Sequence, residues 1–115
     1  MVDIEKASED FAVRIYNLYK YLSYSKKEYI LSNQLLRSGT SIGANVSDAE
    51  GGITKKDFIA KMHIALKEAH ETKYWLRIMR ITELLNSVEY NSIYKDASII
   101  EATIVKILKS SKSDN

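Results

Sequence analysis

The sequence predicts an all-α fold, an antiparallel up-down-up-down bundle of four helices. Apolar residues recur at steps of three and four in four separate stretches of the chain, which is the period of an amphipathic helix. The 115 residues include no Pro, and the 4 Gly all lie between Gly39 and Gly52, whereas sandwiches and barrels need many tight turns. The connections between the four stretches are short, which makes successive helices antiparallel. We expect one domain over residues 1–110 and a frayed tail over 111–115.

The first two helices are predicted over residues 4–24 and 26–50. Ser25 and Glu28 have the spacing of a capping box, which ends one helix and begins the next. Gly51 and Gly52 follow the second helix and supply its stop. The apolar face of the first helix consists of Ile4, Phe11, Ile15, Leu18 and Leu22, and that of the second consists of Leu31, Leu35, Ser38, Ile42, Asn45 and Ala49.

The third helix is predicted over residues 55–85 and the fourth over 88–109, with Ser87 as the cap of the fourth. The third helix carries two apolar faces about 120° apart at 100° per residue, and two faces predict a second packing surface. One face consists of Phe58, Met62, Ala65, Ala69, Leu76 and Met79, the other of Ile64, Trp75, Ile78 and Leu85. The face of the fourth helix consists of Ile93, Ala97, Ile100, Ile104 and Ile107.

Several protein classes are disfavoured by composition. The absence of Cys excludes disulfides, thiolate metal sites and cysteine nucleophiles. The sequence has no apolar run long enough to span a bilayer, and its first residues lack the charged and apolar blocks of a signal peptide. We therefore expect a cytoplasmic protein without a membrane partner.

Gly39 and Gly43 lie four residues apart inside the second helix, where each glycine costs about 1 kcal/mol relative to Ala. The missing side chains predict close approach of another helix at this face. A phosphate-binding loop is disfavoured because the Walker spacing and its preceding strand are absent. Together with the second apolar face of the third helix, these glycines predict self-assembly. Asn45 lies on the apolar face, which favours a role in helix register and interhelical hydrogen bonding over ligand contact.

Charged residues of the second and third helices are spaced to form a partly buried ion network. We expect Glu71, four residues before Trp75, to pair with an Arg or Lys in this network rather than lie on a solvated surface. The candidates are Arg37, Asp48, Glu50, Glu68, Glu71 and Lys73.

The sequence gives no positive indication of catalysis or of a bound metal. His63 and His70 are seven residues apart with Glu71 beside them, but no third ligand follows at a suitable step. No strand-turn-helix elbow surrounds a Ser or Thr, and a compact bundle offers no evident pocket. We expect no catalytic residues, no metal and no cofactor.

Positive charge concentrates in one segment. Residues 54–82 hold seven basic and three acidic side chains, whereas the net charge of the whole chain is only +2. At 100° per residue, Lys55, Lys73, Arg77 and Arg80 fall within about 60° of each other, and Lys56 and Lys67 lie further round the same side. Such a stripe can contact the phosphates of a nucleic acid, or it can be an ordinary solvated face.

Two segments resemble a known family. The first is Arg37-Ser-Gly-Thr-Ser-Ile-Gly-Ala-Asn45, followed by Ala49-Glu50-Gly51. The second is Lys67-Glu68-Ala69-His70-Glu71-Thr72-Lys73-Tyr74-Trp75-Leu76. Both resemble the four-helix bundle family named for proteins encoded in 23S rRNA intervening sequences, to which the accessory protein of diversity-generating retroelements is similar.

The resemblance implies a homopentamer with a central opening and no catalytic residues. In the accessory-protein branch it implies a positively charged barrel that binds nucleic acid, RNA or DNA, and a reverse transcriptase. The residues matching the family motif are expected to be structural, within or between subunits; they are Arg37, Ser41, Asn45, Glu50, Glu68, Glu71 and Trp75.

Three hypotheses of function follow. The first is a non-enzymatic oligomeric bundle that binds structured RNA, or an RNA-protein complex, through the basic stripe. The second is a protein-interaction scaffold that binds no nucleic acid. The third is an enzyme or metal protein that uses His63, His70 and Glu71, and it has the least support.

Overall fold

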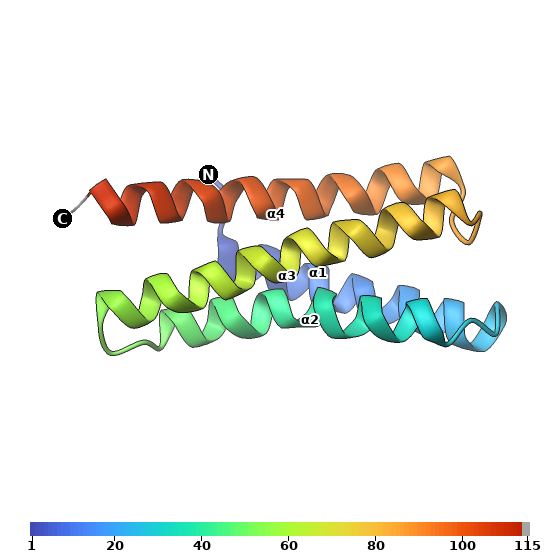
Figure 1. Cartoon of the computed structure of the whole chain (residues 1–115), viewed down its shortest axis with the longest axis horizontal. Coiled ribbons are helices and arrows are strands. Elements are labelled where there is room, and N and C mark those ends of the chain that lie inside the picture. The colour runs from blue at the N-terminus through green and yellow to red at the C-terminus, as the bar shows by residue number, and fades with distance from the viewer. Residues whose placement is uncertain (114–115) are drawn as a thin grey trace.

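The computed structural model describes residues 1–113, and within them it contains four α-helices and no strand. The helices are α1 (Ile4–Lys20), α2 (Ile30–Glu50), α3 (Lys55–Ile81) and α4 (Ser87–Ser113), and a π-helical turn, η1 (Tyr21–Ser25), extends α1. Successive helices run antiparallel over a length of 48 Å (Figure 1). The predicted four-helix bundle is confirmed.

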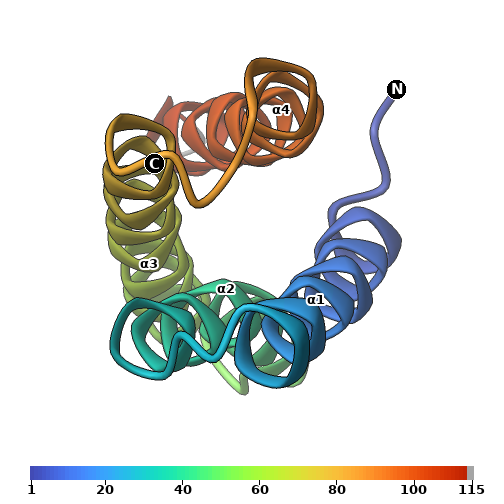
Figure 2. The same cartoon turned by 90° about the vertical axis from the view of Figure 1, so that its right-hand side faces the viewer.

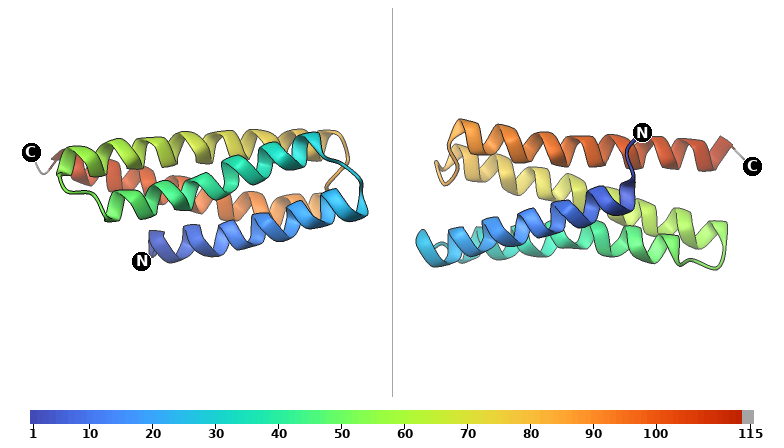
Figure 3. Two further views of the ribbon diagram at one scale, coloured as in Figure 1. Left: turned by 90° about the horizontal axis from the view of Figure 1, so that it is seen from below. Right: turned by 180° about the vertical axis from the view of Figure 1, so that it is seen from behind.

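The bundle is more open on one side than on the others. Each of α2 and α3 packs along two neighbours, whereas α1 and α4 meet only over a small area, and their ribbons diverge when viewed along the bundle (Figure 2). Arg14 joins these two helices by polar contacts: its Nη1 lies 2.6 Å from Asp96 Oδ2, and its Nη2 lies 2.7 Å from Ser92 Oγ. The turns after α1 and after α3 lie at the same end of the molecule (Figure 3).

The core consists largely of the predicted apolar faces, but the unpredicted Val46 and Leu108 are buried, whereas the predicted Asn45 and Ile107 are only half-buried. On α3 the face that includes Met62 and Leu76 is buried, whereas Ile64 on the second face remains exposed. The central part of the core is fully buried; it includes Ile15, Leu22, Leu35, Ile42, Met62, Leu76, Met79 and Ile104. None of the helices within residues 1–113 is long and apolar enough to cross a membrane.

The turn between α1 and α2 differs from the predicted capping box. The amide of Glu28 donates to the Leu22 carbonyl at 2.9 Å, so Ser25 does not cap this segment. Instead the Glu28 carboxylate accepts from the first amides of α2, at 2.8 Å from the Ser32 nitrogen. The second helix consequently begins at Ile30 rather than at residue 26, because Lys27 adopts a positive φ of 59° and the chain leaves the helical path between the π-helical turn and Ile30.

The turn between α3 and α4 is also displaced from its predicted position. The third helix ends at Ile81 instead of residue 85, because Glu83 adopts a positive φ of 66° and the chain reverses there. The reversal still buries Leu85, whose amide donates to the Met79 carbonyl at 3.1 Å.

The fourth helix has a different cap and a later end than predicted. Asn86, and not Ser87, caps α4, since its side chain accepts from the Glu89 amide at 2.8 Å while Glu89 accepts from the Asn86 amide at 2.9 Å. The helix continues to Ser113, so the expected tail begins as helix; positions 114–115 lie outside the described residues.

The two helical glycines of α2 face α1 of the same chain. A Cβ at Gly39 would lie 2.8 Å from two side-chain carbons of Ile15, and a Cβ at Gly43 would lie 3.1 Å from the Ser8 carbonyl oxygen. The predicted close packing is thus confirmed, and its partner is α1. The expectation of self-assembly consequently depends on the outward side of α3 alone.

Candidate nucleic-acid interface

The six predicted basic residues are distributed along the whole of α3. Lys55 and Lys56 lie exposed in its first turn, Lys67 lies exposed near its middle, and Arg77 lies exposed near its end. Arg80 is half-buried. The sixth, Lys73, differs from the others because it is held against α4.

Lys73 is committed to an ion pair inside the bundle. Its Nζ lies 2.9 Å from Glu101 Oε1 and 4.9 Å from the centre of the Tyr94 ring, and its side chain is only 16% exposed. Burial by itself lowers the pKa of Lys73, but the hydrogen bond and charge of Glu101, aided by Tyr94, outweigh it and raise the pKa above its ordinary value. The predicted stripe is therefore interrupted at this residue, which stabilises the contact between α3 and α4.

Arg77 lies among aromatic rings contributed by both helices. Its Nη1 donates to the Tyr94 hydroxyl at 3.2 Å, and its guanidinium carbon lies 5.9 Å from the centre of the Tyr74 ring. Tyr90 packs against Tyr94 with ring centres 4.9 Å apart, and burial, followed by the neighbouring Tyr94, raises the pKa of Tyr90. The guanidinium is thereby oriented while its outer side remains exposed.

The sequence analysis did not identify the α4 residues of this region. Tyr90, Tyr94 and Glu101 are spaced by four and seven residues, so they lie on one side of a helix, and that spacing is visible in the sequence. Their partners on α3 are not visible there, because the pairing depends on how the two helices are rotated about their axes.

The two histidines lie on the outward side of α3. His63 is exposed, and His70 Nδ1 lies 2.8 Å from Glu101 Oε2. That contact is a hydrogen bond only when Nδ1 carries a proton, because a carboxylate oxygen can only accept. Oε2 has no other hydrogen-bond partner among the described residues. Within residues 1–113 no three His, Asp or Glu side chains are grouped so that they could hold a metal ion.

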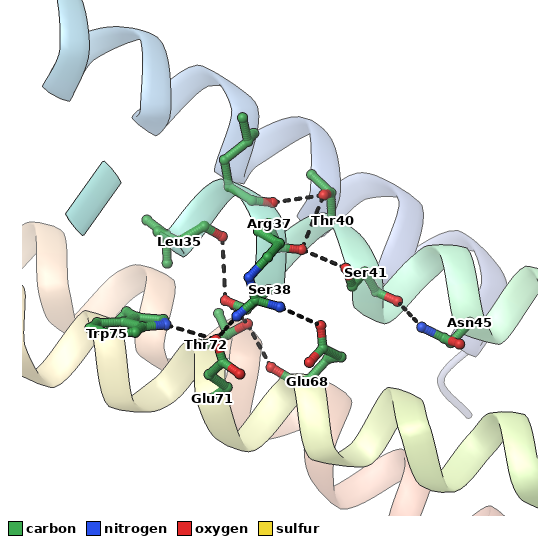
Figure 4. Close-up of polar contacts among 11 residues, drawn as sticks. Leu35, Arg37, Ser38, Thr40, Ser41, Asn45, Glu68, Glu71, Thr72 and Trp75 are labelled. Atoms are coloured by element: carbon green, nitrogen blue, oxygen red, sulfur yellow. Dashed lines mark hydrogen bonds and ion pairs between the residues drawn. The ribbon is translucent and has the colours of Figure 1, made fainter. Parts of the chain in front are cut away.

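An ion network joins α2 to α3 on the opposite side of α3 (Figure 4). Arg37 forms ion pairs with Glu71 and with Glu68, the latter at 3.3 Å between Nη1 and Oε2. Trp75 donates from Nε1 to Glu71 Oε2 at 3.0 Å. The predicted network is confirmed for these residues. Two other candidates have different partners: Lys73 pairs with Glu101 and Asp48 with Lys61, while Glu50 lies exposed at the end of α2.

Small polar side chains continue this contact between α2 and α3. Thr72 Oγ1 lies 3.0 Å from Ser38 Oγ in a fully buried position. Ser41 donates to the Arg37 carbonyl at 2.6 Å, and Asn45 donates to the Ser41 carbonyl at 2.8 Å, so these two bonds lie within α2 (Figure 4). The interhelical bond expected from Asn45 is thus replaced by an intrahelical one, and Ser38 with Thr72 provides the link between the helices.

The comparisons with known proteins agree with this architecture. The family described as "23S rRNA-intervening sequence protein" matches residues 2–106. The chain is also similar to a crystal structure from Bacteroides thetaiotaomicron, described as a protein with unknown function from the S23 ribosomal protein family. The two share 48% sequence identity with a TM-score of 0.91, over 92% of this chain and 95% of the other. The search of curated proteins gives no match.

Neither description names an enzymatic activity. The family match spans all but the last residues of the described structure, and the similar crystal structure repeats the four-helix arrangement at high identity. The resemblance seen in the motifs of α2 and α3 is thereby confirmed, and the chain belongs to the 23S rRNA-intervening sequence protein family.

Proposed function

We propose that this protein binds structured RNA, without catalysing a reaction, through the outward side of α3. The binding surface, here named the α3 cationic face, consists of Lys56, Lys67, Arg77 and Arg80. At 1.5 Å per residue it extends over about 36 Å of helix. Lys73 and Lys55 are left out of this surface, the first because it pairs with Glu101.

The observation that carries the proposal is the separation of charge across α3. Glu68 and Glu71 lie on the side that faces α2, where both form ion pairs with Arg37. None of the four residues of the α3 cationic face forms an ion pair with a described residue, and three of them are exposed. An elongated surface with unneutralised cations favours phosphate contacts, because binding releases the counterions of the nucleic acid.

RNA is the first ligand to test. The family is described by reference to an intervening sequence of 23S rRNA, which favours an RNA of that kind over DNA. Tyr74 lies exposed beside Arg77 and offers a ring on which an unpaired base can stack. A reverse transcriptase is a further proposed partner, and only the family resemblance noted in the sequence supports it.

Assembly is part of the proposal, because a homo-oligomer repeats the α3 cationic face around one axis. The second apolar face of α3 supports it: Ile64 is 43% exposed, and Trp75 and Ile78 are only half-buried. We take the homopentamer implied by the family resemblance as the assembly to test.

The experiment is a titration of nucleic-acid-free protein with a structured RNA across a salt series. Four phosphate contacts predict an affinity that falls about 100-fold between roughly 50 and 200 mM salt. The double variant Arg77→Glu and Arg80→Glu should abolish binding while assembly remains intact. The matched control is Lys95→Glu with Lys106→Glu, which changes the net charge by the same amount. Both lysines are exposed on α4, and they are turned about 120° or more from Glu101, the α4 residue that contacts α3.

Equal affinity of the wild-type protein and the Arg77/Arg80 variant would contradict the proposed site. Absence of any binding at low salt would favour the alternative, a protein-interaction scaffold. That alternative has its own support in the exposed apolar side chains Ile64 and Ile81 of α3.

A further inference from the structure

A second surface lies at the end of the bundle that contains the π-helical turn. This turn exposes Tyr21 and Tyr24, which are 41% and 68% accessible, and it leads into the exposed Lys26 and Lys27. The Nζ of Lys26 lies 5.9 Å from the centre of the Tyr21 ring. Lys27 has a positive φ of 59°, which is rare for a residue with a side chain. Distorted helical turns of this kind frequently occur at functional sites.

A hollow of about 310 Å³ lies beside Tyr21, between the second half of α1 and the start of α4. Figure 2 is a view onto this end of the bundle. The volume is at the lower limit of small-molecule pockets, about 300 Å³, and a single nucleotide base is of suitable size for it. The lining has apolar and polar members; it consists of Arg14, Asn17, Leu18, Tyr21, Leu85, Glu89 and Ile93.

The polar residues of the lining differ in how much of their hydrogen-bonding capacity is already used within the protein. Arg14 is already held by Asp96 at 2.6 Å, and one oxygen of Glu89 accepts from the Asn86 amide in the cap of α4. The exposed amide of Asn17 can both donate and accept, as the edge of a base requires. Glu89 would repel a phosphate placed in the hollow, so the chemistry suits a base inside it and phosphates outside.

We propose that this end of the bundle binds single-stranded nucleic acid, with one unpaired base in the hollow against Tyr21 and the adjoining phosphates at Lys26 and Lys27. Proteins that bind single strands combine aromatic rings, on which the bases stack, with cationic contacts to the nucleic-acid backbone. Charge supports this occupant, because Lys26 and Lys27 lie exposed side by side, while the carboxylate of the adjoining Glu28 is directed at the first amides of α2. The site shares no residue with the α3 cationic face and does not depend on it.

The test is fluorescence anisotropy with an unstructured 12-nucleotide RNA, the DNA of the same sequence, and a hairpin RNA as the duplex probe. Tyr21→Ala should weaken single-strand binding about 5- to 150-fold, the range that corresponds to loss of one stacked base, whereas Tyr21→Phe keeps the ring and should stay within about twofold. Binding of either single strand supports the proposal, and a preference for RNA assigns a contact to the 2′-hydroxyl.

Tyr16→Ala is the matched control, because Tyr16 is 48% exposed on the same helix but points about 140° away from Tyr21. It should leave single-strand affinity within about twofold. Lys26→Ala with Lys27→Ala removes two cations from an exposed turn and should reduce the salt slope of single-strand binding by about 1.4. This second variant keeps the test decisive if Tyr21→Ala does not fold.

The proposal is overturned if neither single strand binds at low salt, or if Tyr16→Ala and Tyr21→Ala weaken binding equally. It is also overturned if single-strand binding is lost with Arg77→Glu and Arg80→Glu but survives Tyr21→Ala. If the Arg77/Arg80 variant loses hairpin binding but keeps single-strand binding, the single-strand site is supported. If the wild-type protein binds single strands but no hairpin, only the function proposed for α3 is refuted.

Discussion

Glu101 joins α3 to α4 through one carboxylate. Its Oε1 accepts from Lys73 at 2.9 Å and its Oε2 faces His70 at 2.8 Å, while the side chain is only 19% exposed. A buried carboxylate of this kind needs a cation, because leaving it alone costs more than the pair contributes. Lys73 therefore belongs to the packing of the bundle, although its position on α3 is that of a surface cation.

Stability should decrease in alkaline solution because of this pair. The pKa of Lys73 is raised above its ordinary value of 10.5, so its contribution is complete below that pH and is lost as the pH rises through the folded-state value. The pKa of Tyr90, raised above 10.0, acts in the same direction, because the unfolded chain loses that proton first.

The test is the urea midpoint measured between about pH 9 and 12, a range that extends above the ordinary pKa of Lys73, for the wild-type protein and for Glu101→Gln. Without the carboxylate, burial lowers the pKa of Lys73, so the variant should lose less stability over this range. Parallel pH profiles for the two proteins would show that Glu101 does not hold the proton of Lys73.

At the residue level, the sequence allowed prediction of charge pairs between α2 and α3, whose motifs are recognisable. It did not allow prediction of pairs between α3 and α4, because α4 carries no such motif. Arg37 and Glu71 were expected in one network, and the structure confirms this. The partner of Lys73 was expected on α2 or α3 and lies on α4, 28 residues away. The spacing of charges along one helix gives their angles on that helix, but the rotation of the neighbouring helix sets which of them meet.

At the scale of helices, the interior periodicity was predictable and the ends were less so. The buried face of α3 is the predicted one, because core positions follow from apolar spacing alone. The start of α2 was misplaced by four residues. The Ser25–Glu28 spacing fits a capping box, but Lys27 adopts a positive φ of 59°, and the Glu28 carboxylate instead caps a helix that begins at Ile30. The spacing of a capping pair does not reveal which backbone conformation lies between its two members.

Replacement of Gly39 tests the closest contact between two helices. Gly39→Ala gains about 1 kcal/mol of helix propensity, but its Cβ would lie 2.8 Å from two carbons of the fully buried Ile15. Overpacking of this kind costs about 1–3 kcal/mol, so the free energy of unfolding should fall. Chemical denaturation monitored by circular dichroism measures it.

Gly51→Ala is the control, because its added Cβ meets only ordinary contacts at 3.8 Å and its φ is negative. Its stability should stay within about 0.5 kcal/mol of the wild-type value. A Gly39→Ala protein as stable as the Gly51→Ala protein would mean that α1 and α2 pack less closely than described.

At the scale of the whole molecule, two different sides of α3 are not fully covered by the other three helices. One side carries Lys56, Lys67 and Arg77, and the other carries Ile64 with the half-buried Trp75. Two apolar faces were visible in the sequence; a bundle of one chain buries most of the first, whereas on the second it buries Leu85 but leaves Ile64 exposed and Trp75 half-buried. The second is available to a further copy of the chain, and an interface there would leave the cations on the outer surface.

Assembly through this second face makes a prediction about mass. Wild-type protein should sediment well above the 13.1 kDa of one chain, and a pentamer has five times that mass. Ile64→Glu places a charge at the centre of the expected interface, where burial of an unpaired carboxylate is costly, so this variant should dissociate to monomers while keeping its helical content.

Ile53→Glu makes the same change at a loop residue that is 94% exposed, and it should leave the mass unchanged. If both variants retain the wild-type mass, the contact lies elsewhere, and a wild-type protein of 13.1 kDa would refute assembly itself.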